Sequence, residues 1–437
     1  MILTVDFGST YTKVTAIGEG IIGTAKAFTT IETDVRDGLN RALAELERQT
    51  GRVRYDKRLA ASSAGGGLKM VAVGLVPNLT TKAALLAAES AGAKVIKTYA
   101  YELTSSEQQE IARLDPDLIL LSGGTDGGNK EVILHNAKKL SEIDSGFAVI
   151  SAGNKTAEDE VEKKLKKGGK HVVVVNNVMP TLGVLDITPA KEAIRNQFMV
   201  KIVEAKGLGL AAKIMDLPII PTPLAVFYAA ELLSAEIGSL AAVDVGGATT
   251  DVYSVAGGAP TKSGVIQKGL PEPFAKRSVE GDLGMRYSLG SLIDAEPKSE
   301  GYEDFLAKCT ADPSYVPGNE DREADSFLCT KAVKIAIKRH SGYLEKTYTP
   351  MGETFYQFGK DLTDVKHLIG IGGALIYAGS PTEILENALK TDDFSMHLLP
   401  KKPSFLFDKK YIFAAMGLLS QVNKNLAVKI MQKEVLP

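Results

Sequence analysis

The sequence predicts an α/β protein that has two lobes of like construction and a complete doubly wound domain inserted into the first lobe. Three observations support this prediction. Apolar runs of strand length alternate with helical patterns along most of the chain. A hairpin motif begins with an aspartate and continues with small residues. It occurs twice, starting at Asp6 and at Asp244. Between the two copies, five strand patterns and four helix patterns alternate in compact β-α units.

Composition excludes several classes of protein. The 437 residues are 44% apolar and 24% charged, which is typical of a globular chain long enough for more than one domain. The 51 basic and 53 acidic side chains give no basic excess, so we expect neither a nucleic-acid nor a membrane-surface partner. Two cysteines, no apolar run of about 18 residues and an apolar strand directly after Met1 favour a cytoplasmic protein without a signal peptide.

The first lobe opens with a three-strand meander and a helix. Apolar patterns separated by Gly-rich turns predict strands at 2–7, 12–18 and 21–30. Leu39, Leu43 and Leu46 lie at helical spacing, which predicts a helix over 34–49. A further strand at 59–63 ends in the turn 64–67, and together these elements form the N-terminal segment of the first lobe, residues 1–67.

The next segment, residues 68–180, has the composition of a complete domain. Its strands are predicted at 69–73, 94–98, 117–121, 147–151 and 171–176. Its helices are predicted at 81–91, 105–113, 130–141 and 157–167. Five strands joined by four helices predict a doubly wound parallel sheet, and we interpret this domain as an insertion.

The host pattern then resumes. Residues 181–238 are predicted to complete the first lobe, with helices at 189–205 and 224–236 and a short strand at 217–221. Residues 239–437 are predicted to form the second lobe. Its strands are expected at 240–245, 249–256, 261–267 and 367–371, and its main helices at 323–345 and 413–421.

The two hairpin motifs predict a site for phosphate groups. A small residue at a hairpin tip lets consecutive backbone N–H groups approach phosphate oxygens, and hydroxyls and a lysine add further donors. The candidate residues of the first tip are Gly8, Ser9, Thr10, Thr12 and Lys13, and those of the second are Gly246, Gly247, Thr249 and Thr250. Asp6 and Asp244, which end the preceding strands, are candidate ligands of Mg²⁺ through water. Two such tips, each at the start of a meander, predict lobes that hold a phosphate chain from both sides.

A third motif follows the predicted strand at 367–371. Gly370, Gly372 and Gly373 surround the point where this strand leads into a helix. Glycines at such a turn let a planar base lie against the backbone, so this motif predicts an adenosine site.

The order of these three motifs resembles the actin-like ATPase superfamily, which includes Hsp70-type chaperones and sugar kinases. The resemblance implies two ribonuclease-H-like lobes that close on Mg-ATP. The whole chain more specifically resembles the glutamate mutase accessory proteins, which share the MutL name with unrelated mismatch-repair proteins. Segments 121–128 and 280–286 are similar to that family's distinctive motifs. The resemblance implies an ATP-dependent chaperone or reactivating factor for an adenosylcobalamin-dependent mutase.

The chain departs from these relatives at two points. Ile219 and Ile220 stand where the Hsp70-type chaperones carry an acid, so catalysis is expected to depend on Asp244 or Asp251, with Asp6, and to be slow. The insert resembles the cobalamin-binding domain of the mutases but lacks their cobalt-ligand motif Asp-x-His-x-x-Gly, since its first loop has the sequence Gly-Leu-Val-Pro-Asn-Leu at 74–79.

Two other functions remain open from the sequence. A small-molecule kinase on the same fold needs a catalytic base, and the turn 64–67 offers none. An ATP-driven activator that holds an iron–sulfur cluster between two subunits needs two cysteines per chain, and Cys309 and Cys329 are the two available.

Overall fold

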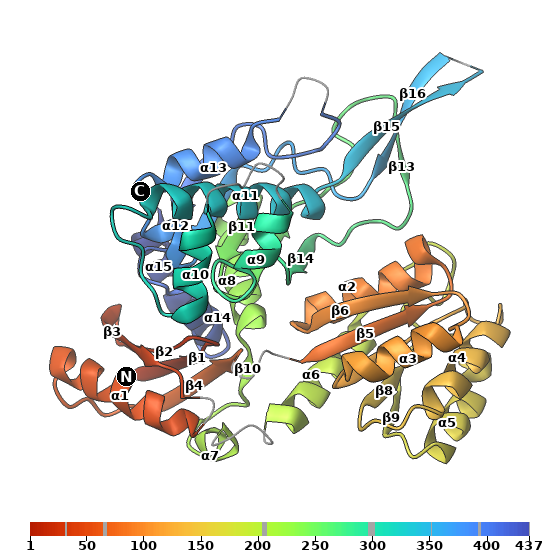
Figure 1. The fold of residues 1–437 in the computed structure, drawn as a ribbon, viewed down its shortest axis with the longest axis horizontal. Coiled ribbons are helices and arrows are strands. Elements are labelled where there is room, and N and C mark those ends of the chain that lie inside the picture. The colour runs from red at the N-terminus through yellow and green to blue at the C-terminus, as the bar shows by residue number, and fades with distance from the viewer. Residues whose placement is uncertain are drawn as a thin grey trace. The chain divides into compact units, whose positions relative to one another are not determined.

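The computed structural model describes residues 1–30, 33–63, 68–202, 208–295, 302–350, 352–391 and 395–436 (Figure 1). The chain divides into two compact units. The host unit comprises residues 1–65, 205–268 and 272–437, and the insert unit comprises residues 66–204 and 269–271.

The first sheet of the host unit has five strands. They are β1 (Ile2–Phe7), β2 (Tyr11–Ile17), β3 (Ile21–Phe28), β4 (Lys57–Ser62) and β10 (Ile220–Pro221), in the order β10-β4-β1-β2-β3. The meander β1-β2-β3 is antiparallel, whereas β4 runs parallel to β1 and β10 runs parallel to β4.

The second sheet repeats this topology. Its strands are β11 (Leu240–Val245), β12 (Thr250–Val255), β14 (Ala275–Glu280), β17 (His367–Ile371) and β18 (Ser404–Phe407), in the order β14-β12-β11-β17-β18. The meander β11-β12-β14 is again antiparallel, and β17 and β18 again add in parallel. The predicted duplication is therefore confirmed, and the pair of mixed sheets fits the actin-like ATPase fold.

Helices surround both sheets of the host unit. They are α1 (Val35–Thr50), α7 (Leu208–Ala212), α8 (Thr222–Ile237), α9 (Leu289–Asp294), α10 (Glu303–Ala311), α11 (Arg322–His340), α12 (Gly373–Ile376), α13 (Pro381–Leu389), α14 (Phe413–Ser420) and α15 (Lys424–Val435). The amphipathic α1 is capped by Asp34, whose side chain accepts from Arg36 N, and it packs on β2 and β3.

Two central helices join the two sheets. α8 packs against β11 and β12 of the second sheet, α14 packs against β1 and β4 of the first, and the two helices pack against each other. Their apolar residues form one core with residues of both sheets, such as Leu59 and Ile369. At the crossing, a Cβ on Gly417 would overlap the carbonyl oxygen of Ala225, so only glycine permits this approach.

A third, small sheet of the host unit corrects two sequence predictions. It consists of β13 (Val265–Lys268), β15 (Tyr343–Thr349) and β16 (Gly352–Phe358), in the order β13-β16-β15. The helix predicted over 323–345 ends at His340, because Gly342 packs against the backbone of Phe358 and Gly359 and the aromatic and β-branched residues after it pair with β16. The strand predicted at 261–267 is confined to β13, since Thr261 is held instead by Asp361.

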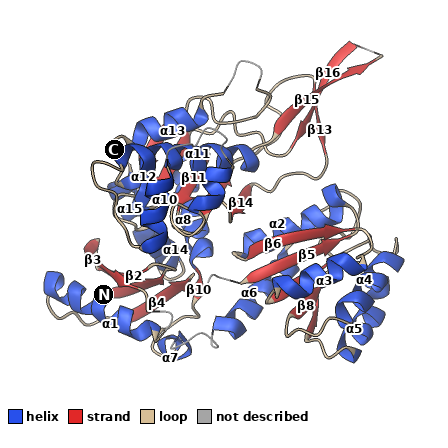
Figure 2. Cartoon of the chain, viewed as in Figure 1, coloured by secondary structure: helices blue, strands red, loops and turns tan. Residues whose placement is uncertain are grey.

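The insert unit is a parallel doubly wound sheet. Its strands are β5 (Lys69–Gly74), β6 (Lys94–Ala100), β7 (Leu118–Leu121), β8 (Ala148–Ser151) and β9 (Val172–Val174), in the order β6-β5-β7-β8-β9. Its helices are α2 (Lys82–Ala91), α3 (Ser105–Leu114), α4 (Glu131–Ser141), α5 (Glu158–Lys167) and α6 (Thr188–Ile202). Figure 2 shows these helices in blue beside the red strands, with α3, α4 and α5 packed on one face and α2 on the other.

The insert unit extends beyond the predicted range of 68–180. The helix α6 contacts α2 and β8 and is therefore part of this unit, whereas the sequence places it in the first lobe. Helical periodicity alone does not show which sheet a helix packs on. None of the described helices is both long enough and apolar enough to cross a membrane.

Candidate functional site

The two predicted tips are closed by equivalent backbone hydrogen bonds. In the first, Gly8 N donates to the carbonyl oxygen of Tyr11 at 3.1 Å, and in the second, Gly246 N donates to that of Thr249 at 2.9 Å. A Cβ on Gly8 would stand 2.6 Å from the Tyr11 oxygen, and one on Gly246 would stand 2.9 Å from the Thr249 oxygen. Each turn therefore requires glycine at its first position because of its own carbonyl group, whereas the sequence suggested a small residue there for the approach of phosphate.

Each tip presents two consecutive backbone donors. The N–H groups of Ser9 and Thr10, and those of Gly247 and Ala248, donate to no other group in the described part of the chain. Adjacent N–H groups at a tight turn that donate to no protein group form a concavity that suits an anion. The geometry thus fits phosphate oxygens at both tips.

The tips also face each other. Thr10 Oγ1 lies 3.7 Å from the position that a Cβ would take on Gly247. The second tip is supported from behind, because Met285 N and Arg286 N donate to the carbonyl oxygens of Gly246 and Gly247 at 3.0 and 2.8 Å. The segment 280–286, which the sequence singled out, therefore fixes the shape of this tip.

Asp6 lies at the end of β1 and is almost fully buried. Its carboxyl accepts a hydrogen bond from Thr222 Oγ1 at 2.6 Å, and Lys13 Nζ lies 3.9 Å from its other oxygen. Burial raises the pKa of Asp6, while Lys13 and the Thr222 hydrogen bond oppose this rise. Thr222, at the start of α8 and shortly after Ile219 and Ile220, thus places a hydroxyl beside this acid.

Asp244 occupies the equivalent place at the end of β11. Burial and the neighbouring carboxylate of Asp251 raise the pKa of Asp244 to about 7, against the attraction of Lys13. Asp408 and Asp6 contribute to the same rise. A carboxyl destabilised by burial and by other acids gains from a bound cation, so this position suits Mg²⁺.

Asp251 has a different environment. Its Oδ1 accepts from Arg277 Nε and Nη2 at 3.0 and 2.6 Å, and its Oδ2 accepts from Thr249 Oγ1 at 2.9 Å. Both oxygens are therefore held by protein groups. Of the two acids that the sequence left as alternatives, Asp251 is thus the one whose oxygens are occupied by protein donors.

Besides Thr249, whose hydroxyl donates to Asp251, two further predicted hydroxyl donors are engaged within the fold. Thr12 is fully buried, and its Oγ1 lies 3.0 Å from Thr29 Oγ1. Thr250, its equivalent in the second sheet, is also fully buried and donates to the carbonyl oxygen of Leu283 at 2.6 Å. Their assignment as phosphate donors is corrected, because strand residues after a tip alternate between the two faces and these two face the packed side.

The three glycines of the predicted adenosine site have separate roles. Gly372 has φ +97° and a Cβ there would overlap the backbone of Val245, so it permits β17 to lie beside the second tip. Gly370 lies within β17, where a Cβ would meet Leu375 and Phe407, so its place is in the core. At Gly373 the nearest atom is in a side chain, since a Cβ there would stand 2.7 Å from Tyr411 Oη.

Sequence reasoning missed an aromatic group between the lobes. Tyr411 lies beside Gly373, and Lys13 Nζ stands 4.5 Å from the centre of its ring. Tyr377 lies 6.0 Å from Tyr411 by ring centroids, and Lys26 Nζ stands 5.7 Å from the Tyr377 ring. These residues come from loops and strand faces without a distinctive local pattern, so no sequence signal identified them.

Asp408 was also missed. It is buried, and it accepts from Ile412 N and Phe413 N at 2.8 and 2.9 Å, which caps the start of α14. Burial raises the pKa of Asp408. The available signal was an aspartate shortly before an apolar helix, which is typical of a helix N-terminus.

The two cysteines lie inside the second lobe. Cys309 in α10 and Cys329 in α11 are buried in one apolar cluster, and burial raises the pKa of both thiols. Such thiols are not positioned to share a cluster with a second subunit. The turn 64–67, where a kinase base was sought, lies outside the described residues.

The family model described as MutL protein matches residues 2–435. The chain belongs to the MutL protein family. Protein MutL of Clostridium tetanomorphum is 47% identical to it over 458 aligned positions, which span 99% of this chain and 98% of that protein. The expected family is confirmed for the chain as a whole.

Two solved structures to which this MutL-family chain is similar are distant in sequence. Component A of (R)-2-hydroxyglutaryl-CoA dehydratase from Acidaminococcus fermentans is 9% identical, with 98% of both chains covered and a TM-score of 0.33. A ROK family glucokinase from Streptomyces griseus, in complex with glucose and AMPPNP, is 11% identical, with 99% of both chains covered and a TM-score of 0.32. Because both TM-scores are below 0.5, these similarities do not establish the fold. The fold is established by the sheet topology described above.

Proposed function

We propose that this MutL-family chain binds Mg-ATP between its two tips and hydrolyses it slowly, so that closure of the lobes drives the reactivation of an adenosylcobalamin-dependent mutase of the glutamate mutase or aminomutase type. The observation that carries the nucleotide site is the pair of equivalent tips, each with two unclaimed N–H groups and a carboxyl directly before it. A duplicated arrangement of this kind suits a phosphate chain held from both sides.

The residues in and beside the two tips would have different roles in binding Mg-ATP. The N–H groups of Ser9, Thr10 and Gly247 would hold phosphate oxygens. Asp6 and Asp244 would hold Mg²⁺ through water, and the ion would neutralise phosphate charge. Asp244, which would hold Mg²⁺ only through water, would also orient the attacking water and accept its proton. Gly373 would lie against the adenine, and Tyr411 must move if the base is to reach it.

The mutase partner is supported by family membership and by the insert unit. The insert has the strand order 2-1-3-4-5 of doubly wound domains, and its Gly-rich loop 123–128 follows β7 at the point where the strand order reverses. Asn177 Nδ2 donates to Gly124 O, and Asn154 Nδ2 donates to Gly128 O, so the loop has a fixed shape. We propose that this domain, which resembles a cobalamin-binding domain without its cobalt ligand, docks on the mutase in place of the native one.

Two other functions are less well supported. A small-molecule kinase would need a base beside the first tip, and Asp6 is already engaged by Thr222 and Lys13. An activator that shares an iron–sulfur cluster would need accessible thiols, whereas Cys309 and Cys329 are buried.

Replacing Gly373 with valine is expected to weaken ATP binding by about 1–3 kcal/mol, because the added side chain fills the position proposed for the base. The measurement is ATP affinity by calorimetry. Gly290→Val, in α9 where no atom stands within 4 Å of the added Cβ, is the control. Unchanged affinity in a folded Gly373→Val protein would place the adenine elsewhere.

Replacing residues 66–204 with a short Gly/Ser linker is expected to leave ATP hydrolysis intact and to abolish mutase binding, because the insert would carry the docking surface. The measurements are phosphate release, co-purification with the mutase subunit, and recovery of an inactivated mutase. If the shortened protein restores the mutase at the normal rate, the insert is a spacer and the docking proposal fails.

A further inference from the structure

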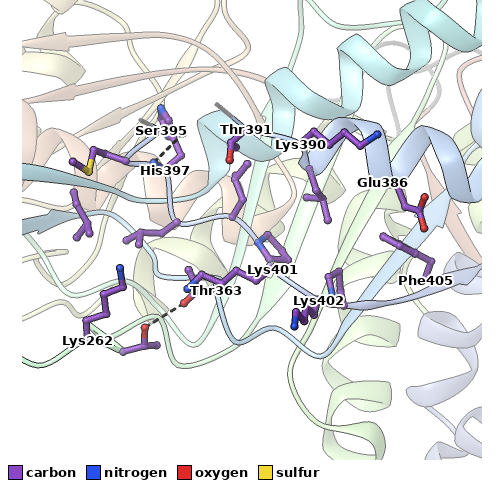
Figure 3. Close-up of a pocket in the computed structure, with 18 residues that line it drawn as sticks. Lys262, Thr363, Glu386, Lys390, Thr391, Ser395, His397, Lys401, Lys402 and Phe405 are labelled. Carbon is purple, nitrogen blue, oxygen red and sulfur yellow. Dashed lines mark hydrogen bonds between the residues drawn. The ribbon is translucent and has the colours of Figure 1, made fainter. Parts of the chain in front are cut away.

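A separate pocket of about 540 Å³ lies in the second lobe, and none of the residues of the two tips lines it. Figure 3 shows the side chains that line it. Its walls come from the loop after β12, from the end of α13 and from residues 395–403 before β18. Its volume falls within the range of small-molecule sites. The function proposed above makes no use of this pocket.

Backbone hydrogen bonds fix the walls of the pocket. Leu344 N donates to Met396 O at 2.8 Å, and Leu362 N donates to Leu398 O at 3.0 Å, so the segment 395–403 is tied on two sides. On the opposite wall, the Asp361 carboxylate accepts from Thr261 Oγ1 at 2.9 Å. A pocket that is already formed loses little entropy when it binds a ligand.

The Asp361 carboxylate also holds a second threonine, Thr363, whose N and Oγ1 donate to it at 2.9 and 2.6 Å. Thr261 and Thr363 both line the pocket, and their side-chain oxygens lie 3.2 Å apart. Asp361 therefore joins the loop that carries Lys262 to the loop that leads into β17, and it fixes the backbone position of that lysine.

The lining is strongly basic. It contains four lysines and one carboxylate, namely Lys262, Lys390, Lys401, Lys402 and Glu386. Within the described part of the chain none of these lysines forms an ion pair, and Lys390 donates only to Asn387. Burial and the nearby Lys338 lower the pKa of His397, so its ring adds no charge at neutral pH. Positive charges that surround a concave surface raise the local concentration of anions.

The rest of the lining is apolar. It includes Leu344, Leu389, Pro400 and Phe405. A bare inorganic anion would leave this surface unused, whereas a ligand with a planar or apolar body would cover it. We propose that the pocket binds a small phosphate monoester of nucleotide size, with its phosphate at the lysines and its body on the apolar wall.

This pocket and the second tip lie at opposite ends of β17. Thr363 and Lys402 precede β17 and β18, whereas Gly372, which adjoins the second tip, follows β17. Two independent ligands can therefore occupy the second lobe, and variants of one site can be chosen that leave the other unaltered.

The test uses AMP and adenosine as probes of the full-length chain, by calorimetry at low salt without magnesium. We expect AMP to bind, and the paired change Lys401→Gln/Lys402→Gln to weaken it at least about tenfold through the loss of charge-assisted contacts. Adenosine should bind at least about tenfold more weakly than AMP. Lys424→Gln/Lys429→Gln, which removes the same charge from exposed positions of α15, should leave AMP affinity unchanged.

Gly373→Val separates this site from the nucleotide site proposed above. AMP affinity that is retained in Gly373→Val and lost in the Lys401/Lys402 variant supports the pocket. AMP affinity lost in Gly373→Val and retained in the Lys401/Lys402 variant overturns the pocket and leaves the nucleotide site standing. Absence of AMP binding in the wild-type chain also overturns it.

Discussion

Asp244→Asn is expected to reduce ATP hydrolysis at least about 100-fold while leaving nucleotide affinity nearly unchanged. Asparagine keeps the shape and an oxygen ligand but cannot accept a proton, and proton transfer by a positioned group commonly contributes about 10²–10⁴-fold. The measurement is phosphate release under saturating Mg-ATP, with affinity from calorimetry. Asp294→Asn, an exposed carboxylate at the end of α9, is the control. Wild-type turnover in both Asp244→Asn and Asp6→Asn would show that the site is misassigned.

Asp244→Asn is also expected to change how the stability of the metal-free protein depends on pH. Because the pKa of Asp244 is raised to about 7, the folded chain keeps a proton there that the unfolded chain releases near pH 4. The stability that this proton contributes is fully present below pH 4 and is lost as the pH rises through 7. We therefore expect the free energy of unfolding to fall between pH 5 and 8 more steeply in wild type than in Asp244→Asn. Parallel curves would contradict the raised pKa.

Gly417→Ala is expected to destabilise the host unit by about 3 kcal/mol, at the upper end of the usual cost of overpacking. The added Cβ would overlap the carbonyl oxygen of Ala225, which is backbone and cannot rotate away, so α8 and α14 must separate. These helices carry the core that joins the two sheets, and their separation should also weaken ATP binding. Urea denaturation and calorimetry measure the two effects.

A matched control distinguishes this crowding from the ordinary effect of alanine in a helix. Gly290 lies in α9, and no atom stands within 4 Å of a Cβ built there. Gly290→Ala should therefore be neutral or stabilising by up to about 1 kcal/mol, since alanine is the better helix former. If Gly417→Ala behaves like Gly290→Ala, the close crossing of α8 and α14 is not present in solution.

The tips could be predicted from the sequence because their determinants are local. A strand that ends in an acid, followed by a glycine that must approach a carbonyl three residues on, specifies a turn within a single short segment. Gly8 with Tyr11 and Gly246 with Thr249 satisfy this rule. The strand patterns of the insert were equally local, and its five parallel strands follow from five apolar runs separated by helices.

The errors in the fold arise where local patterns are ambiguous. The helix predicted over 323–345 continued through Ser341 and Gly342, because short polar segments fit a helix or a strand by pattern alone. Pairing with β16 decided the outcome. Likewise, Thr12 and Thr250 follow the tips in sequence, but the side on which each strand packs places their hydroxyls inside the fold.

The sequence by itself determined the α/β class, the duplicated tips, the doubly wound insert and the family. These properties depend on residue spacing within single elements. The tertiary structure alone decided which side chains meet at the site: Thr222 with Asp6, Arg277 with Asp251, and Tyr411 with Lys13. It also decided the crossing at Gly417 and the basic pocket at Lys401 and Lys402. These contacts join residues far apart in the chain, and no pattern within one element specifies which distant residue will pack against it.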